Sequence, residues 1–191
     1  MIIYNNIFND IVSLDNLFLS WEEFKKGKTN KRDVLEFELN LEQNIFKLHK
    51  NLKNHSYKHG KYTSFSISDP KPRKINKATI IDRILHHAAC RVIIPIFEPT
   101  FIAYSFSCQK NKGTHKGVKT LGRMTRKASK NNLNSCFVLK CDVKKFFENI
   151  DHNILLQIIF KKIKDKEAQD LITEIVESFN PGIPLGNVTS Q

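Results

Sequence analysis

Apolar residues recur at helical spacing over much of the first fifty positions. Between Arg32 and Leu52 they fall every three or four residues, while charged residues such as Glu36 and Lys47 occupy the other side. This pattern predicts one amphipathic helix over residues 32–52. A shorter helix is expected before it, with Asp15 as its N-cap and with an apolar face formed by Leu17, Phe18, Trp21 and Phe24.

The period of the pattern changes from helical spacing to alternation at about Tyr62. Residues 62–68 alternate aromatic or β-branched side chains with serine, Asp69-Pro70 is a turn dipeptide, and residues 71–75 restart an extended basic segment. We therefore predict a β-hairpin. Helical spacing returns over residues 80–97, with Pro95 near the end of the predicted helix.

The second half of the chain predicts helices separated by loops and one strand. Residues 101–117 resemble a basic loop, and helices are expected over residues 119–130, 153–162 and 166–179. Asp151 is the expected N-cap of the second of these helices. Alternation and β-branching over residues 137–143 predict a short strand, which we expect at the centre of an antiparallel sheet.

Composition adds a partner class to this picture. The 191 residues contain 31 Lys and Arg against 19 Asp and Glu, a formal net charge of +12, with a pI of about 9.6. A positive surface favours phosphate backbones or anionic membranes, and nucleic acid is the leading expectation. The apolar runs are far shorter than the ~20 residues that span a bilayer. The first residues lack a signal-peptide pattern, so we expect a cytoplasmic protein with no membrane partner.

Cysteine and histidine spacing gives no sign of a zinc site. Cys90, Cys108, Cys136 and Cys141 form no C-x-x-C pair and are spaced unevenly. His86 and His87 are adjacent, so on a helix they point about 100° apart. We therefore expect neither a zinc knuckle nor a disulfide framework.

Asp142 is the strongest candidate for a catalytic residue. It stands where the predicted strand ends, and Lys144, Lys145, Phe146 and Phe147 follow closely. A carboxylate fixed at a strand end can hold Mg²⁺, which keeps its other positions for water and phosphate, so phosphoryl transfer is the natural chemistry. The structural alternative is an Asp that caps the following turn.

The segment around Asp142 resembles the first catalytic motif of reverse transcriptases. Residues 137–152 read FVLKCDVKKFFENIDH. The resemblance implies that Asp142 and the backbone carbonyl of Val143 hold two Mg²⁺ ions, with Mn²⁺ as an alternative. It also implies that Phe147 packs against the sugar of the incoming dNTP and excludes a 2′-hydroxyl, whereas Phe146 is expected to pack in the core.

A second stretch, residues 69–101, resembles the fingers segment of bacterial reverse transcriptases. It includes DPKPRKI, IIDRILHHA and IIPIFEPTF. The resemblance implies that Lys71, Arg73 and Lys74 meet the triphosphate or the template phosphates, with Arg73 best suited because a guanidinium makes forked contacts. A solvated basic loop is the alternative. SFSCQKNKGTHKG, at residues 105–117, also resembles this region, but its role stays open.

The final residues, GIPLGNVTSQ, resemble the family motif that pairs with the first one. There a glycine-rich turn lies against the nascent base pair, so Gly182 and Gly186 are implied to avoid a collision, and Ser190 and Gln191 to start a helix beside the template. Leu185 stands where many family members have Gln. This form is similar to the reverse transcriptases of diversity-generating retroelements, which copy an RNA with errors at adenines, and it implies looser base selection at Leu185.

The resemblance covers nearly the whole chain and implies an α+β fold with right-hand polymerase fingers and an incomplete palm. We assign residues 1–60 to a helical extension, 61–136 to fingers and 137–191 to a partial palm. The expected partners are an RNA template, a DNA or RNA primer, dNTPs and an accessory protein. The sequence contains no Asp-Asp, so we expect the 191 residues alone not to polymerise. A non-catalytic RNA-binding module and a group II intron or retron-type enzyme remain alternatives.

Overall fold

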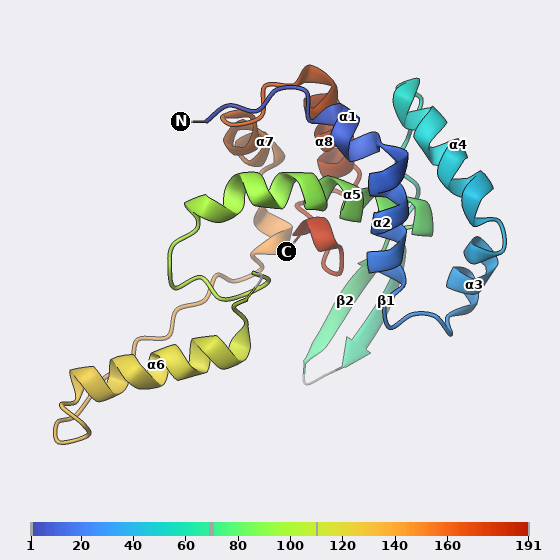
Figure 1. Cartoon of the computed structure of the whole chain (residues 1–191). Coiled ribbons are helices and arrows are strands. Elements are labelled where there is room, and N and C mark those ends of the chain that lie inside the picture. The colour runs from blue at the N-terminus through green and yellow to red at the C-terminus, as the bar shows by residue number, and fades with distance from the viewer. Residues whose placement is uncertain (1, 69–70, 110, 191) are drawn as a thin grey trace. The chain divides into compact units, whose positions relative to one another are not determined.

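The computed structural model describes residues 2–68, 71–109 and 111–190 (Figure 1). The described residues form an α+β protein with eight α-helices and a two-stranded antiparallel sheet. The chain divides into two compact units. The core unit comprises residues 1–96 and 145–191, and the inserted unit comprises residues 97–144. None of the described helices is long and apolar enough to span a membrane.

The N-terminal part of the core unit holds four helices. They are α1 (Phe8–Val12), α2 (Leu14–Lys25), α3 (Arg32–Glu38) and α4 (Leu41–Lys53). The predicted N-cap at Asp15 is wrong, because Ser13 Oγ accepts the hydrogen bond from the Asn16 amide that caps α2. The single helix predicted over residues 32–52 is also wrong. Its backbone breaks at Asn40, with φ −124° and ψ 36°, and Leu39 in the predicted apolar stripe is 84% exposed.

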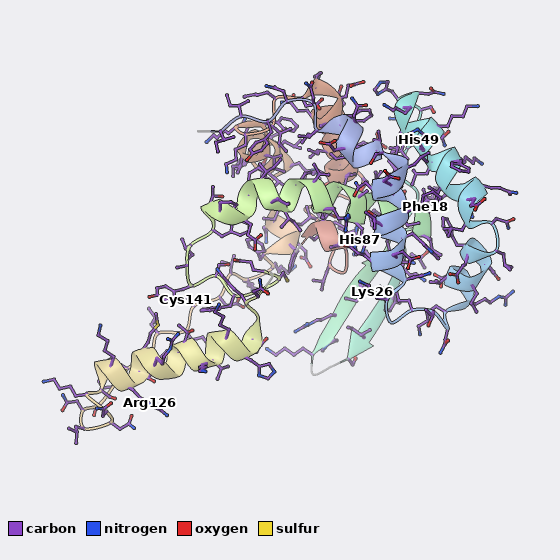
Figure 2. The ribbon with its side chains drawn as sticks, viewed as in Figure 1. Phe18, Lys26, His49, His87, Arg126 and Cys141 are labelled. Atoms are coloured by element: carbon purple, nitrogen blue, oxygen red, sulfur yellow. The ribbon has the colours of Figure 1, made fainter. Side chains whose placement is uncertain are left out.

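The hydrophobic core of this unit is built around α2 and α5 (Ile80–Phe97), the second of which has the bounds predicted from the sequence. Trp21 is fully buried, with its ring centroid 5.8 Å from that of Phe24 and 5.1 Å from that of Phe37. Ile84 and Leu85 of α5 are also fully buried. Figure 2 shows the labelled Phe18 on α2 and His87 on α5. Burial of these large side chains, at roughly 25 cal/mol per Å² of apolar surface, is the main stabilising contribution.

The predicted hairpin is confirmed. Strand β1 (Thr63–Ser68) pairs antiparallel with β2 (Pro72–Lys77), with Phe65 opposite Ile75 and Ile67 opposite Arg73. The predicted turn at Asp69-Pro70 lies outside the described residues. Asp33 of α3 accepts a hydrogen bond of 2.5 Å from Lys77 at the end of β2, and this bond lowers the pKa of the Asp33 carboxyl. The hairpin is thereby attached to the helical part of the unit.

The C-terminal part of the core unit contains α7 (His152–Phe160), α8 (Lys166–Glu177) and the short 3₁₀ helices η2 (Phe147–Asn149) and η3 (Val188–Ser190). The predicted cap at Asp151 is confirmed, because its side chain accepts from the Ile154 amide at 2.9 Å. Tyr4 forms a parallel bridge with Ile163, in the link between α7 and α8. This bridge joins the N-terminal and C-terminal parts of the core unit.

The inserted unit contains the 3₁₀ helix η1 (Glu98–Thr100) and the helix α6 (Thr114–Ala128). The strand predicted over residues 137–143 is wrong, because these residues have no regular secondary structure. A strand needs a neighbour to pair its backbone N–H and C=O groups, and no described strand pairs with this segment. Phe137 and Leu139 are 95% and 88% exposed. The expected central palm strand is therefore absent from the described structure.

Candidate functional site

The glycine-rich turn at the end of the chain packs directly on the backbone of the 3₁₀ helix η2. Gly182 has φ +66°, and a Cβ at this position would lie 2.1 Å from the carbonyl oxygen of Phe147. The Ile183 amide donates to the same carbonyl at 2.9 Å, and His152 Nε2 donates to the Gly182 carbonyl at 2.6 Å. The fold itself therefore requires glycine at position 182, independently of any bound base pair.

The same turn contacts the basic hairpin at its other end. The Asn76 amide donates to the Leu185 carbonyl at 3.1 Å. Gly186 has φ +113°, and a Cβ there would lie 2.8 Å from Cγ2 of Ile75. Since side chains alternate along a strand, Arg73 lies on the face of β2 that carries Ile75, whereas Lys74 lies on the opposite face. Arg73 thus shares the sheet face that meets Gly186.

Three sequence motifs therefore converge within the core unit: the hairpin, the start of η2 and the glycine-rich turn. Phe147 is half-buried at this junction, and its ring lies edge-on to that of Phe146 at 5.5 Å. The core role expected for Phe146 is wrong, because that side chain is 50% exposed. Leu185 is half-buried and Gly186 is exposed. The junction thus presents the residues implied to contact the nucleotide.

The remaining predicted site residues have simpler surroundings. Lys71, Arg73 and Lys74 are exposed on the hairpin, so their positive charges are accessible to anionic ligands. Ser190 is half-buried in the 3₁₀ helix η3, while Gln191 lies outside the described residues. A helix beginning at these two positions is therefore untested beyond the single turn at Ser190.

The proposed metal ligands lie in the inserted unit. Asp142 and Val143 are both exposed in the segment without regular secondary structure. Within residues 2–68, 71–109 and 111–190, no group of three or more His, Cys, Asp or Glu side chains is arranged to hold a metal ion. Asp142 and its neighbouring carbonyl alone do not form a two-metal site, which needs further carboxylates.

A buried polar network, which no sequence pattern predicts, supports the glycine-rich turn. Asn187, next to Gly186, is 2% exposed, and its Nδ2 donates to the Tyr62 hydroxyl at 3.2 Å. That hydroxyl also lies 2.9 Å from Ser178 Oγ and 3.3 Å from His59 Nε2. Residues from the segment before β1, from the C-terminal cap of α8 and from the turn thus meet at one tyrosine oxygen.

The network continues from His59 to α5. His59 Nε2 lies 3.2 Å from His86 Nε2, and His59 Nδ1 donates to the Gly60 carbonyl at 2.7 Å. One of these two Nε2 atoms donates to the other. In the described structure the buried Nδ1 of His86 has no hydrogen-bond partner. Burial beside His59 lowers the pKa of His86 to about 3.

A buried carboxylate completes the network. Asp82 is 1% exposed and accepts hydrogen bonds from the hydroxyls of Tyr57 and Thr79, each at 2.6 Å, and from the Gly60 amide at 3.2 Å. Burial and the neighbouring Asp82 charge raise the pKa of Tyr57. These bonds satisfy a charge that would otherwise be costly to bury. The network therefore holds residues 57–62, which lead into β1, against α5.

His86 gives the chain a specific pH dependence. The folded state keeps His86 neutral down to about pH 3, whereas the unfolded chain protonates it near pH 6.5. The unfolded state thus binds more protons as the pH falls, and stability is lost below about pH 6.5. Between pH 7 and pH 5 we expect the free energy of unfolding to fall by about 2 kcal/mol more in the wild type than in His86→Asn. Urea titrations at both pH values measure this difference, and equal pH dependence of the two proteins would contradict it.

No signal in the sequence marks this network as a unit. His59 and His86 are 27 residues apart, and Asn187 follows Tyr62 by 125 residues. Sequence reasoning considered His86 only with its neighbour His87, which is not part of the network. Only the folded arrangement brings these groups together.

Comparison with known proteins agrees with the motif resemblance. No family model matches the chain. The chain is 28% identical over 108 residues to the group II intron-encoded protein LtrA of Lactococcus lactis subsp. cremoris, and equally to that of strain MG1363. The matched stretch covers 56% of this chain and only 17% of the length of LtrA. Together with the three converging motifs, this similarity supports a distant relationship to reverse transcriptases.

Proposed function

We propose that the chain is the fingers and part of the palm of an RNA-directed DNA polymerase. The observation that carries the proposal is the contact of the glycine-rich turn with both the Phe147 carbonyl and strand β2. This contact joins the segments that resemble the nucleotide-binding motifs of reverse transcriptases. A two-metal polymerase must hold a primer end and a triphosphate in line, and in this proposal these segments do so.

Each site residue has a role in this proposal. Arg73 and Lys71 bind the triphosphate, because exposed cations on the hairpin neutralise phosphate charge. Phe147, Leu185 and Gly186 contact the sugar and base of the incoming nucleotide. Lys74, Ser190 and Gln191 contact the template and primer, whereas Gly182 is buried and acts by holding the turn against Phe147.

Asp142 and the Val143 carbonyl are the proposed ligands of Mg²⁺, which would supply electrostatic stabilisation of the transferring phosphate. Their segment offers one carboxylate, so the proposal requires further carboxylates to complete the site. The whole protein's RNA template, primer, dNTPs, accessory protein and cytoplasmic location are parts of the same proposal.

The sugar contact at Phe147 gives a direct test. In the gene product purified from its source cells, Phe147→Ala should raise the use of ribonucleotides relative to deoxynucleotides by about tenfold or more, because the aromatic ring no longer blocks a 2′-hydroxyl. Primer extension on an RNA template with each nucleotide set measures the ratio. Phe146→Ala is the matched control and should leave the ratio unchanged. An unchanged ratio in both variants would remove Phe147 from the sugar site.

Leu185 bears on the branch of the family. We place the protein among diversity-generating enzymes, since Leu185 cannot hydrogen-bond a nucleotide as Gln would, which favours looser base selection. Its carbonyl accepts a hydrogen bond from the Asn76 amide, which fixes the backbone that carries this side chain. A template repeat and a variable repeat beside the gene would support this branch. Intron sequences flanking the gene would instead support the group II type, to which LtrA's name refers.

The second candidate function is a basic module that binds RNA without catalysis. The observation that favours it is the exposed basic helix α6, which needs no metal to bind a phosphate backbone. The two functions differ in their need for Asp142. A polymerase requires that carboxylate, whereas a binding module does not.

A further inference from the structure

Helix α6 carries a continuous stripe of positive charge. Lys116, Lys119, Arg123, Arg126 and Lys127 are all exposed. At 100° per residue these five positions fall within an arc of about 100°, and at 1.5 Å per residue they extend over roughly 16 Å. The other side of the helix holds the apolar residues. The spacing thus gathers the cations on one face instead of distributing them around the helix.

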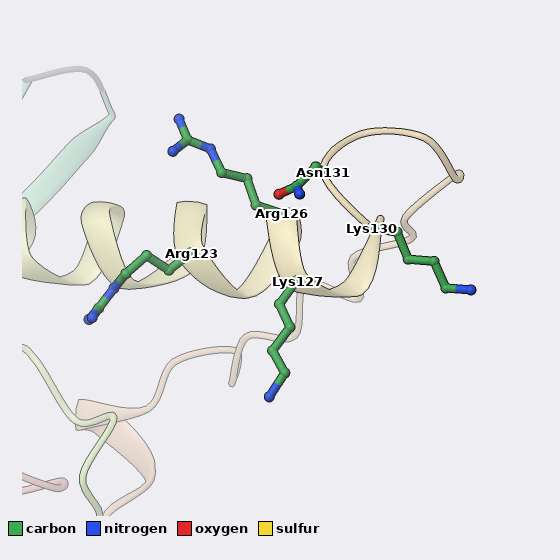
Figure 3. Close-up of a pocket in the computed structure, with 5 residues that line it drawn as sticks. All are labelled: Arg123, Arg126, Lys127, Lys130 and Asn131. Atoms are coloured by element: carbon green, nitrogen blue, oxygen red, sulfur yellow. The ribbon is translucent and has the colours of Figure 1, made fainter.

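The turn after α6 extends this stripe. Arg123, Arg126, Lys127, Lys130 and Asn131 line a concave surface with a volume of about 420 Å³ (Figure 3). The Asn131 amide donates to the Arg126 carbonyl at 2.8 Å, and Lys130 and Asn131 have φ of +50° and +61°. The backbone of the turn is therefore fixed next to the end of the helix, and Lys130 is held beside the stripe.

No acidic side chain neutralises this charge within the segment. Between Pro99 and Cys141 the sequence contains no Asp or Glu. It contains nine cationic residues in the same range: Lys110, Lys112, Lys116, Lys119, Arg123, Arg126, Lys127, Lys130 and Lys140. In the described part of the chain none of the five stripe residues forms an ion pair.

This concentration of charge has a cost in the free protein. Like charges three or four residues apart on a helix destabilise it by about 0.2–0.5 kcal/mol per pair. Lys119 and Arg123, as well as Arg123 and Lys127, have this spacing. A polyanion laid along the face would remove the repulsion and release its own counterions.

The residues around the stripe favour a nucleic-acid duplex over a single strand. Single strands are held by aromatic side chains on which bases stack, and α6 and the turn after it, residues 114–134, contain no Phe, Tyr or Trp. The exposed aromatic residues of this unit, among them Tyr104 and Phe137, lie outside the stripe. Arginine forks and lysines suit the phosphates of an A-form duplex, which proteins recognise by shape and backbone.

The apolar side of α6 argues against a membrane. It carries Val118, Leu121 and Met124 but neither Trp nor Phe, the aromatic anchors that membrane-surface helices favour on this side. Phe106 already lies against this helix, because a Cβ on Gly117 would be 3.4 Å from the Phe106 ring.

We propose that α6 and the turn after it bind the phosphate backbone of double-stranded RNA, a contact that does not depend on polymerase activity.

The test is binding of the full chain to a 20-base-pair RNA duplex of arbitrary sequence, measured by fluorescence anisotropy over a series of salt concentrations. Lys119→Gln, Arg123→Gln and Arg126→Gln are combined in one variant, because Gln keeps helix propensity while removing charge. We expect at least tenfold weaker binding near 0.1 M salt. The slope of log affinity against log salt should also fall by about 2 to 3, at close to 0.9 per lost phosphate contact.

A matched control removes the same charge from the core unit. Lys47, Lys50 and Lys53 are exposed at three-residue spacing on α4, and their replacement by Gln should change duplex affinity less than twofold. Equal losses in both variants would reduce the effect to net charge and overturn the proposal. Tighter binding of the unmodified chain to an unstructured single strand than to the duplex would also overturn it. So would a result in which the triple variant of α6 lost binding to anionic lipid vesicles but kept its binding to RNA. Asp142→Asn should leave duplex affinity unchanged, so a failure here is distinct from a failure of the polymerase proposal.

Discussion

Replacing Asp142 by asparagine is expected to reduce RNA-templated cDNA synthesis by at least about a thousandfold. That loss corresponds to about 4 kcal/mol of transition-state stabilisation, at 1.36 kcal/mol per tenfold. Asparagine has the size of aspartate but no negative charge, so it cannot replace a carboxylate ligand of Mg²⁺. Asp142 is exposed in the described structure, and no buried contact depends on its charge. The fold should therefore survive, and primer extension by the native gene product measures the effect on synthesis alone.

Glu148→Gln provides the control for this variant. Glu148 is six residues from Asp142, and its exposed carboxylate pairs with Lys145 at 3.0 Å. Exposed pairs of this kind contribute at most about 1 kcal/mol, so Glu148→Gln should keep nearly full activity. Full activity of Asp142→Asn would exclude this carboxylate as a metal ligand. If the native gene product bound RNA but made no cDNA, whether unmodified or carrying Asp142→Asn, the result would favour the non-catalytic module.

Replacing Gly182 by alanine is expected to destabilise the core unit by about 2–5 kcal/mol. Two costs add in this variant. The left-handed conformation at φ +66° disfavours any residue with a Cβ by about 1–2 kcal/mol. The added Cβ would also lie 2.1 Å from the Phe147 carbonyl oxygen. Shifting the two backbone segments to relieve this clash costs about 1–3 kcal/mol. Urea unfolding followed by the fluorescence of Trp21 measures the sum.

Gly27 separates the two costs. Its φ of +70° is close to that of Gly182, but nothing lies within 4 Å of its Cβ position. Gly27→Ala should therefore lose only the conformational part, about 1–2 kcal/mol. If both alanine variants lost the same stability, the contact between the turn and the Phe147 backbone would contribute nothing.

The sequence predicts those parts of the fold that depend on local pattern. The hairpin and the helix Ile80–Phe97 follow from alternation, turn residues and helical spacing, and both are confirmed. The junction near Asn40 could not be predicted, because Leu35 and Leu39 continue the apolar spacing although both are largely exposed. Periodicity reports where apolar residues could be buried, whereas tertiary contacts decide which of them are.

The site divides in the same way between local and long-range features. The motifs marked Phe147, Gly182 and Gly186, and the structure brings them together with β2. The strand over residues 137–143 has a good local pattern but no partner among the described strands, since pairing is not a local property. The network of His59, His86 and Asn187 was missed for the same reason.

The inserted unit also separates the two halves of the core unit along the chain. Residues 1–96 and 145–191 meet only after the 48 residues between them close a loop, which costs roughly 3 kcal/mol of chain entropy from its length alone. Contacts such as the Tyr4–Ile163 bridge and the bond from Asn76 to Leu185 offset that cost. Because these contacts are far apart in sequence, they form only after the loop has closed. Cleavage in the exposed segment after α6 would leave two fragments held together by the same contacts.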